Sequence, residues 1–194
     1  MNVYDFDKTL YPRDSTLEFY LASLLRHPSF LLDLPKALLM ALRHKRGKIS
    51  TEAAREAFFA SFRRLKSPEA EAERFWEKRK ERLFPFYREI RREDDVIISA
   101  SPEFILRPIA RHAAFGTLIA SRLDADFRYE EDGRCYGESK PRRFYELFPD
   151  GKVQAFYSDS LSDTPMARLA EQAYLTKGGK PLPWPSEALK GADR

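Results

Sequence analysis

The sequence predicts an α/β fold, a doubly wound parallel sheet with a helical domain inserted after its first strand. Three observations lead to this prediction. A short strand-like run at residues 2–9 ends in carboxylates, later strand-like runs at 96–98 and 153–157 each lead into a helix start, and the long stretch between the first two runs has helical periodicity. Because the strands of such a sheet are parallel, the polar residues that end them are expected to meet at one edge.

The first run carries Asp5 and Asp7 beside the apolar Val3 and Phe6. Residues two apart in an extended backbone project to the same side, so both carboxylates can face one ligand. Two like charges on one face repel each other and are costly to bury, which indicates that a cation or a proton holds them. The alternative interpretation of this run is a solvated turn in which an aspartate caps a helix.

The second run, Val96-Ile97-Ile98, opens into Ser99-Ala100-Ser101-Pro102. We expect a helix to begin at Pro102 with Ser101 as its cap, because the first helical position needs no amide hydrogen. A serine hydroxyl beside a helix N-terminus forms a site for anions, and for phosphate in particular.

A third segment, Gly137 to Pro141, places Lys140 just before a helix that Pro141 is expected to begin. The N-terminus of a helix is electrostatically unfavourable for a lysine, so a lysine kept there indicates a bound anion. The alternative is a lysine side chain that extends freely into solvent.

The fourth segment follows the strand-like run at 153–157 with a serine-rich acidic loop that contains Asp159 and Asp163. Pro165 again predicts a helix start. Two carboxylates in such a loop can converge on a hard cation, and oxygen ligands of this kind suit Mg²⁺, which shares its shell with waters and a substrate phosphate. Asp163 alone is equally well explained as a helix cap.

Together the four segments resemble the haloacid dehalogenase superfamily of phosphohydrolases, and the resemblance covers nearly the whole chain. The matched positions are Asp5-Phe6-Asp7-Lys8-Thr9, Ser99, Lys140 and Asp159 to Asp163. The resemblance implies a Rossmann-like core. It also implies that Asp5 is the nucleophile, which forms an aspartyl-phosphate, and that Asp7 is the general acid and then the general base.

The resemblance assigns the remaining roles residue by residue. Lys140 neutralises charge on the phosphate and steadies Asp5, and the substrate phosphate is bound by Thr9, Ser99, Ala100 and Lys140. The expected cofactor is Mg²⁺, held by Asp5, Asp7, Asp159 and Asp163. Two positions depart from a simple match: Lys8 stands where many relatives carry glycine, and Ser101 competes with Ser99 for the phosphate.

The stretch between the first two motifs is expected to be a helical cap. The predicted domains are an α/β core at 1–12 and 94–194 and a cap at 13–93, a placement that resembles the cap of phosphoserine phosphatases. Helical spacing of apolar residues recurs at 16–25, 29–42, 53–65 and around 75–84, with breakers at Pro28, Gly47, Pro68 and Pro85. Asp14 is expected to cap the first of these helices, with a contact to the cap as the alternative.

One part of the cap, residues 30–42, is rich in leucine and is followed by a basic run at 43–48. It cannot span a bilayer, because Asp33, Pro35 and Lys36 interrupt it. The favoured interpretation is that the leucines fill the cap core and that the basic run is a solvated loop. The alternative is an interfacial segment that meets anionic lipid, which would add lipid phosphates to the possible substrates.

The rest of the chain indicates an ordinary enzyme domain. Its 194 residues are 43% hydrophobic with a formal charge of +4, and they contain one cysteine, Cys135, which is expected to be packed. We expect strands at 116–121 and 173–176, a hairpin at 127–136 and an irregular tail at 177–194 that Trp184 pins to the core. The cytoplasm is the expected location, no nucleic-acid motif is evident, and oligomeric state cannot be predicted.

The predicted function is therefore that of a Mg²⁺-dependent phosphomonoester hydrolase acting on a small phosphorylated metabolite or a lipid head group. Two alternatives differ from it in class. One is a lipid-phosphate phosphatase at the membrane surface, similar to phosphatidylglycerophosphatases, and the other is a phosphate-binding module without turnover. A phosphotransferase that uses an acceptor other than water is a further possibility.

Overall fold

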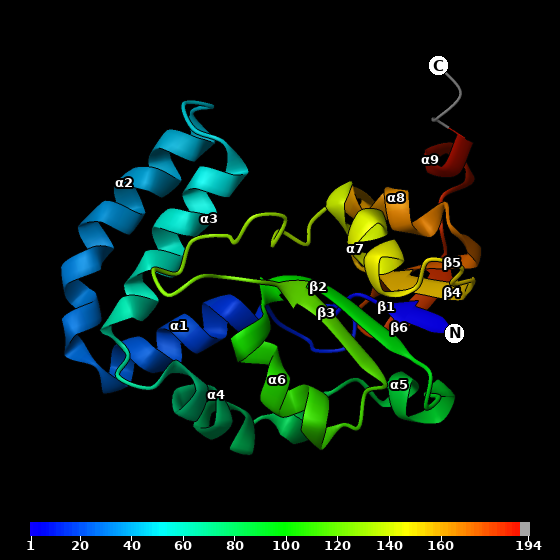
Figure 1. The fold of residues 1–194 in the computed structure, drawn as a ribbon, viewed down its shortest axis with the longest axis horizontal. Coiled ribbons are helices and arrows are strands. Elements are labelled where there is room, and N and C mark those ends of the chain that lie inside the picture. The colour runs from blue at the N-terminus through cyan, green and yellow to red at the C-terminus, as the bar shows by residue number, and fades with distance from the viewer. Residues whose placement is uncertain (191–194) are drawn as a thin grey trace.

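The computed structural model describes residues 1–190, which form a central sheet with helices on both faces (Figure 1). Within these residues the sheet has six strands in the order β3-β2-β1-β4-β5-β6. All neighbouring strands are parallel except β5 and β6, which are antiparallel. The predicted doubly wound parallel sheet is confirmed. The strands are β1 (Asn2–Tyr4), β2 (Val96–Pro102), β3 (Thr117–Ser121), β4 (Val153–Ser158), β5 (Ala170–Lys177) and β6 (Lys180–Pro183).

The described helices fall into two groups along the chain. Those between β1 and β2 are α1 (Ser15–Arg26), α2 (Leu34–Lys45), α3 (Thr51–Phe59), α4 (Pro68–Glu77) and α5 (Pro85–Ile90). Those that follow β2 are α6 (Glu103–His112), α7 (Ser139–Leu147), α8 (Thr164–Ala167) and α9 (Ser186–Lys190). Short 3₁₀ turns at 28–33, 60–64, 80–82 and 161–163 join them.

Alternation of side chains along the strands builds a separate core on each face of the sheet. Val3 and Ile98 belong to one buried cluster, which α7 and α8 cover. Tyr4 and Ile97 belong to the other, which contains buried side chains of α1, α4 and α6. Successive residues of β1 and β2 therefore point to opposite faces, as the pleat of a strand requires.

The order of the strands decides where the functional residues meet. β1 lies between β2 and β4, and all three run in parallel. Their carboxyl ends therefore lie side by side at one edge, and the residues that follow β1 and β4 are Asp5 and Asp159. This edge, at the point where the chain crosses from one half of the sheet to the other, is the usual ligand site of open α/β sheets.

Three predicted element boundaries differ from the structure. β2 continues through Pro102, with an irregular register against β3 between Ile98 and Pro102, so α6 begins at Glu103 and Ser101 does not cap it. Helix α7 begins at Ser139, two residues before Pro141. Helix α8 ends after one turn, and β5 therefore begins at 170 instead of 173.

The loops and the tail also differ from the prediction. The expected hairpin at 127–136 contains no strand, and only an isolated bridge joins Leu123 to Tyr129. The tail is not irregular in its described part, since it forms β6 and α9. Trp184 is buried 6.0 Å from the ring centre of Phe156, so it pins the tail as predicted. The end of that predicted segment, 191–194, lies outside the described residues.

Most of the helices between β1 and β2 form where helical spacing predicts them, but the stretch expected around 75–84 leaves its α-helix at Glu77 and continues as a 3₁₀ turn. Buried side chains of α1 and α4 belong to the core on one face of the sheet, whereas α2 and α3 pack on each other at one side of it (Figure 1). Trp76 of α4 donates a hydrogen bond from its indole Nε1 to the Ile105 carbonyl oxygen at 2.6 Å. Phe62 makes a tilted ring contact with cap residue Phe19 and edge-to-face contacts with Phe104 and Phe127 from outside the cap. Because cap and sheet share this aromatic cluster, the division into a core at 1–12 and 94–194 and a cap at 13–93 stays a prediction.

Candidate active site

Asp5 follows β1 directly and is buried at the carboxyl edge of the sheet. Its backbone amide donates to the Tyr157 carbonyl oxygen of β4 at 2.8 Å, which continues the sheet hydrogen bonding past the end of β1. Its carboxylate accepts from Lys140 Nζ at 2.7 Å through Oδ1 and from Thr9 Oγ1 at 3.3 Å through Oδ2. The backbone and both carboxylate oxygens are therefore held, and the side chain has a fixed orientation.

Lys140 is the cation at the centre of the site and has only 1% of its surface exposed. It lies in the first turn of α7, and its Nζ also donates to Asp163 Oδ2 at 2.7 Å. That oxygen accepts a second hydrogen bond, from Ser158 Oγ at 2.7 Å. Burial by itself lowers the pKa of Lys140, but the carboxylates of Asp163 and Asp5 outweigh it and raise the pKa. Lys140 is thus a permanent cation that joins β1 to the loop after β4.

Asp7 lies in the same site but has different partners. Its Oδ1 accepts from the backbone amide of Ser15 at 2.8 Å, and its Oδ2 accepts from Ser101 Oγ. Burial raises the pKa of the Asp7 carboxyl to about 6, and the nearby charge of Asp14 adds to the rise, while the hydrogen bonds from Ser101 and Ser15 oppose it. Such a carboxyl can hold a proton near neutral pH and release it, as a general acid must.

The pKa of Asp5 is also raised, to about 7, chiefly by burial. The Lys140 ammonium opposes this shift and the Asp163 carboxylate adds to it. A second cation beside Asp5 would favour the ionised form and lower this pKa again. Asp5 is therefore a carboxylate whose nucleophilic, ionised form depends on the positive charge around it.

The two serines that compete for the phosphate have different surroundings. The Ser101 hydroxyl is engaged with Asp7 and lies 2.7 Å from Thr16 Oγ1. The Ser99 hydroxyl accepts from the Ser101 backbone amide at 3.1 Å and lines the cavity beside Asp5. Ser99 retains its own hydroxyl hydrogen for a ligand, which favours Ser99 over Ser101 as the phosphate contact.

The cavity at this edge has a volume of about 250 Å³ and is lined from both the sheet and the cap. Ala100 lines it, whereas Thr9 lies behind Asp5 and contacts the cavity only through that carboxylate. The sequence did not predict two of its lining side chains, Arg55 of α3 and Tyr136. The full set is Asp5, Asp7, Lys8, Asp14, Arg55, Ser99, Ala100, Tyr136, Lys140, Asp159, Ser160, Ser162 and Asp163.

The charges that line this cavity are unbalanced. Its five aspartates face three basic side chains, Lys8, Arg55 and Lys140, which leaves two negative charges when all the groups are ionised. A phosphate dianion would be repelled by such a cavity unless a divalent cation entered with it. Asp159 is the aspartate that is available to such a cation, because no other side chain among residues 1–190 pairs or hydrogen-bonds with its half-buried carboxylate.

The residues present fit Mg²⁺ in chemistry and do not form a ready-made cage. Among residues 1–190, no three carboxylate, histidine or cysteine side chains cluster closely enough to hold a metal unaided. Mg²⁺ needs few protein ligands, because it usually keeps several waters and binds the substrate phosphate. Asp5 and Asp159 would supply hard oxygen atoms. Asp163 accepts from Lys140 and Ser158 through Oδ2, and its Oδ1, which accepts no hydrogen bond within residues 1–190, would be a further ligand. Asp7 presents its side chain to Ser15 and Ser101, so only its backbone is left for a metal.

Lys8 lines the same cavity and has an uncommon backbone conformation. Its φ angle is +58°, in the left-handed region that glycine adopts without strain. In this chain the turn carries an ammonium group. Burial raises the pKa of the Asp159 carboxyl, and the charge of Lys8 opposes that rise.

Asp14 has the helix-capping role predicted for it. Its Oδ1 accepts from the Leu17 backbone amide at 2.8 Å and so caps α1. It also lines the cavity. A second cavity of about 250 Å³ adjoins the first and shares Asp7, Asp14, Arg55 and Ala100 with it, but its other walls are more apolar: Thr16, Leu17, Phe58, Phe59 and Ser101.

The loop 122–138 holds the cap over the site from the core side. The Arg55 guanidinium lies 4.9 Å above the ring centre of Tyr136, and Arg134 pairs with Glu52 of α3 at 3.5 Å. The backbone amide of Tyr129 donates to Glu56 Oε1 at 3.1 Å. Figure 1 shows this loop extending from the sheet toward α3. The cap is thus joined to the core through this loop as well as through the chain itself.

The fold and the site together define an α/β enzyme with a carboxylate-rich catalytic edge covered by helices. A family model described as "haloacid dehalogenase-like hydrolase" matches residues 3–168, and the chain belongs to this family. The membership expected from the four motifs is therefore confirmed.

Three similar proteins show how far the resemblance extends in sequence and in structure. Protein CicA of Caulobacter vibrioides is 37% identical over 97 residues, which cover 44% of this chain and 42% of that protein. A protein of unknown function from Bordetella pertussis Tohama I has a TM-score of 0.71 at 23% identity, over 89% of this chain and 87% of that one. A phosphoserine phosphohydrolase-like protein from Francisella tularensis has a TM-score of 0.55 at 18% identity, over 89% and 86%. The two structures show that the whole fold is shared.

Proposed function

We propose that the protein is a Mg²⁺-dependent phosphomonoester hydrolase that works through an aspartyl-phosphate on Asp5. The observation that carries the proposal is the cavity beside Asp5, whose two unbalanced negative charges suit a divalent cation together with a phosphate. Membership of a hydrolase family supports it. A module that only bound phosphate would gain nothing from a buried carboxylate aimed into the phosphate site.

In the first step an Asp5 carboxylate oxygen attacks phosphorus, and the bond from phosphorus to the alcohol oxygen breaks. The Asp7 carboxyl gives its proton to that oxygen, so the alcohol leaves neutral. In the second step the Asp7 carboxylate takes a proton from water as the water oxygen attacks phosphorus, which releases phosphate and restores Asp5. The pKa of Asp7, raised by burial to about 6, suits both transfers.

The surrounding residues lower the barrier mainly through charge and position. Unaided hydrolysis of a phosphomonoester is among the slowest of biological reactions, so the site must supply on the order of 20 kcal/mol or more. Lys140 and the Ser99 hydroxyl would contact the phosphoryl oxygens, and Lys140 holds Asp5 in line. Bound Mg²⁺, held by Asp5, Asp159 and the Asp7 backbone, would supply the positive charge that lets an anionic nucleophile approach an anionic ester.

The size and lining of the cavity support a small phosphorylated substrate. About 250 Å³ accommodates a phosphate and little more, and the adjoining apolar cavity would receive the alcohol part. Arg55 stands where the two cavities meet and would contact a polar group of the substrate. A cytoplasmic location stays a prediction.

The test is phosphate release from a panel of soluble and lipid phosphomonoesters with Mg²⁺ or with chelator. We expect turnover that needs Mg²⁺ and that Asp5→Asn abolishes, a fall of at least about 10³-fold, because an amide cannot act as the attacking oxyanion. Asp150→Asn, at an exposed position after α7, is the matched control and should keep full activity. Full activity in a folded Asp5→Asn protein would disprove the proposal, as would turnover that is unchanged by chelator.

A further inference from the structure

Helix α2 has two apolar faces, and only one of them packs on the protein. Its half-buried residues Leu34, Ala37 and Met40 recur every three residues and form one face. Leu38, Leu39 and Leu42 lie on another face, with 63%, 51% and 43% of their surfaces exposed. No residue of α2 is fully buried. The favoured sequence interpretation, in which the leucines fill the cap core, is therefore wrong for these three, and Phe30 fills the core instead.

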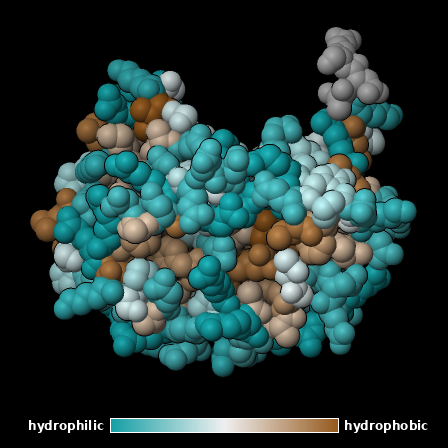
Figure 2. Space-filling view, viewed as in Figure 1, coloured by the Kyte–Doolittle hydropathy of each residue, from teal (hydrophilic) through white to brown (hydrophobic). Residues whose placement is uncertain are grey.

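The exposed leucines continue beyond α2. Leu31 and Leu32, in the preceding 3₁₀ turn, are 54% and 72% exposed, and Leu25 at the end of α1 is 87% exposed. We call this set of six leucines, 25, 31, 32, 38, 39 and 42, the leucine ridge. Figure 2 shows brown, hydrophobic side chains along the outer edge of the molecule, where Figure 1 places α2. Apolar side chains gathered on one exposed helix edge mark an interaction surface.

The charges on α2 and in the turn after it are all of one sign, while Asp33, just before α2, is paired with Arg64. Residues 34–50 contain Lys36, Arg43, Lys45, Arg46 and Lys48 and no aspartate or glutamate. The last four are exposed at the end of α2 and in the following turn. None of these five takes part in an ion pair within residues 1–190, although many of the other basic residues do. The cluster is therefore not neutralised by the protein itself.

We propose that the leucine ridge and this basic cluster dock the protein on an anionic lipid surface. Leucines that enter the acyl boundary beside lysines and arginines that meet lipid phosphates are the two elements of interfacial binding. An uncharged protein partner would use the leucines and leave the basic cluster without a counterpart. The proposal does not depend on the phosphatase activity, because it rests on side chains outside the active site.

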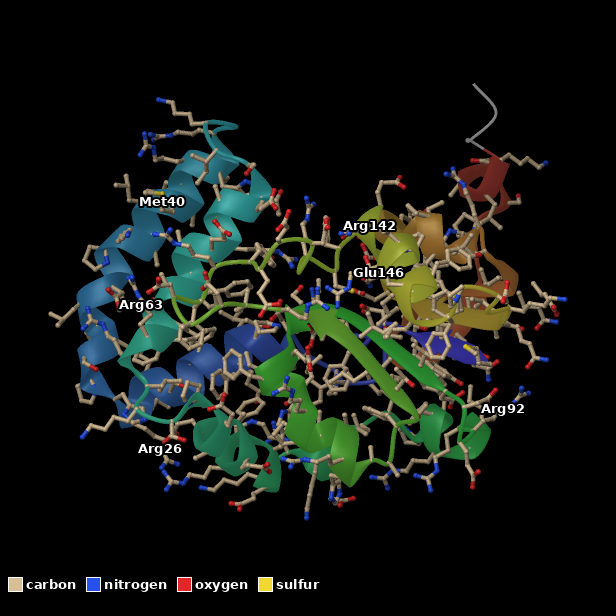
Figure 3. The ribbon with its side chains drawn as sticks, viewed as in Figure 1. Arg26, Met40, Arg63, Arg92, Arg142 and Glu146 are labelled. Carbon is tan, nitrogen blue, oxygen red and sulfur yellow. The ribbon has the colours of Figure 1, made fainter. Side chains whose placement is uncertain are left out.

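The docked protein lies on the lipid surface and does not enter it deeply. None of the helices formed by residues 1–190 is long and apolar enough to cross a membrane. Helix α2 has 12 residues, so it is about 18 Å long and much shorter than the hydrocarbon core. Met40 of α2 lies toward one side of the molecule and Arg92, shortly before β2, toward the opposite side (Figure 3), so docking through the ridge leaves most of the sheet in water.

The experiment is co-sedimentation of the full chain with vesicles of phosphatidylcholine alone or with about one third phosphatidylglycerol. We expect binding to the anionic vesicles that weakens as salt is added. The variant Leu38→Gln/Leu39→Gln/Leu42→Gln removes the three ridge leucines that lie on α2, and Arg43→Gln/Lys45→Gln/Arg46→Gln removes three of the five basic charges. Each should weaken binding at least about tenfold, since each contact contributes separately.

Matched controls separate this surface from general effects of the substitutions. Leu147→Gln/Leu182→Gln changes exposed leucines elsewhere, and Lys152→Gln/Lys177→Gln/Lys180→Gln removes the same charge elsewhere. Both controls should bind like the unchanged protein. All four variants should keep its melting temperature and its phosphate release from a soluble ester, because none of these residues lines the cavity beside Asp5.

Three results would overturn the proposal. One is the absence of binding to anionic vesicles at low salt. Another is equal binding by the ridge variant and its control. The third is a dimer in analytical ultracentrifugation that only the ridge variant dissociates, which would show that a second copy of the chain covers the face. Failure of phosphate release in the same preparations would bear only on the proposed function.

Discussion

The cavity beside Asp5 and the outer face of α2 differ in which kind of side chain they bury and which they expose. At the cavity, Asp5, Lys140 and Asp163 bury their charges. On α2, large apolar side chains are left in solvent. Both arrangements reverse the usual distribution, in which charges are exposed and leucines are buried. Departures from the usual distribution mark surfaces that can bind other molecules, and we propose a phosphate as the partner in one case and a lipid surface in the other.

The two regions also differ in what holds them together. Each buried charge of the site has a partner at hydrogen-bond distance. When one partner is removed, the other stays buried as an uncompensated charge, which is destabilising. The leucines of α2 have no such dependence. Substitutions should therefore affect stability strongly in the first region and hardly at all in the second.

The largest expected effect is that of Lys140→Met, which leaves Asp5 and Asp163 buried without a cation. We expect the free energy of unfolding to fall by about 3–5 kcal/mol, measured by urea titration in the presence of chelator. Lys152→Met, at an exposed site, is the control and should change it by less than about 0.5 kcal/mol. A loss below about 1 kcal/mol for Lys140→Met would mean that Asp5 and Asp163 can be buried together without the ammonium group.

The next prediction contrasts two apolar residues of the cap. Phe62 is fully buried at the centre of the aromatic cluster. We expect Phe62→Ala to lower the free energy of unfolding by about 3–5 kcal/mol. Leu38→Ala on the outer face should change it by no more than about 0.5 kcal/mol. Thermal and urea unfolding of the two variants measure the difference. Similar losses in both would show that the outer face of α2 is packed in solution.

The smallest effect is a change of stability with pH that Asp7 causes. The pKa of Asp7 is about 6 in the folded protein, whereas the ordinary value for an aspartate is 3.8. Between pH 4 and 6 the folded state therefore keeps a proton that the unfolded state has released. Stability therefore falls as pH rises through this window, by about 2 kcal/mol for this group.

Asp7→Asn removes the titration and should remove that slope. The measurement is the difference in unfolding free energy between Asp7→Asn and the unchanged protein, at pH 4 and at pH 6 with chelator present. The variant should gain relative stability at the higher pH. A difference that does not vary with pH would show that Asp7 titrates alike in both states.

Much of the site could be predicted because its signals are local. Asp5 and Asp7 follow a strand two residues apart, and Lys140 stands beside a helix start, so the chain order alone points to one edge of a parallel sheet. Arg55 and Tyr136 reach the same cavity from the cap and from a long loop. Their position depends on how distant segments pack, and no local pattern carries that information.

Other parts of the prediction failed for identifiable reasons. Apolar spacing shows that α2 is a helix but does not show which of its apolar faces has a partner. The edge strand β6 contains Pro181 and Pro183, which argue against a strand except at the edge of a sheet. Gly178-Gly179 between β5 and β6, both with positive φ, was the available signal for that hairpin.

The loop 122–138 carries a consequence for turnover. Because Tyr129 and Arg134 of this loop hold α3 from below, the cap cannot open as a flap on its two chain connections alone. Movement of the cap away from the sheet would require these contacts to break as well. We therefore expect substitutions at Tyr129 and Arg134 to change how fast the cap opens and closes, while the residues that line the cavity beside Asp5 stay the same.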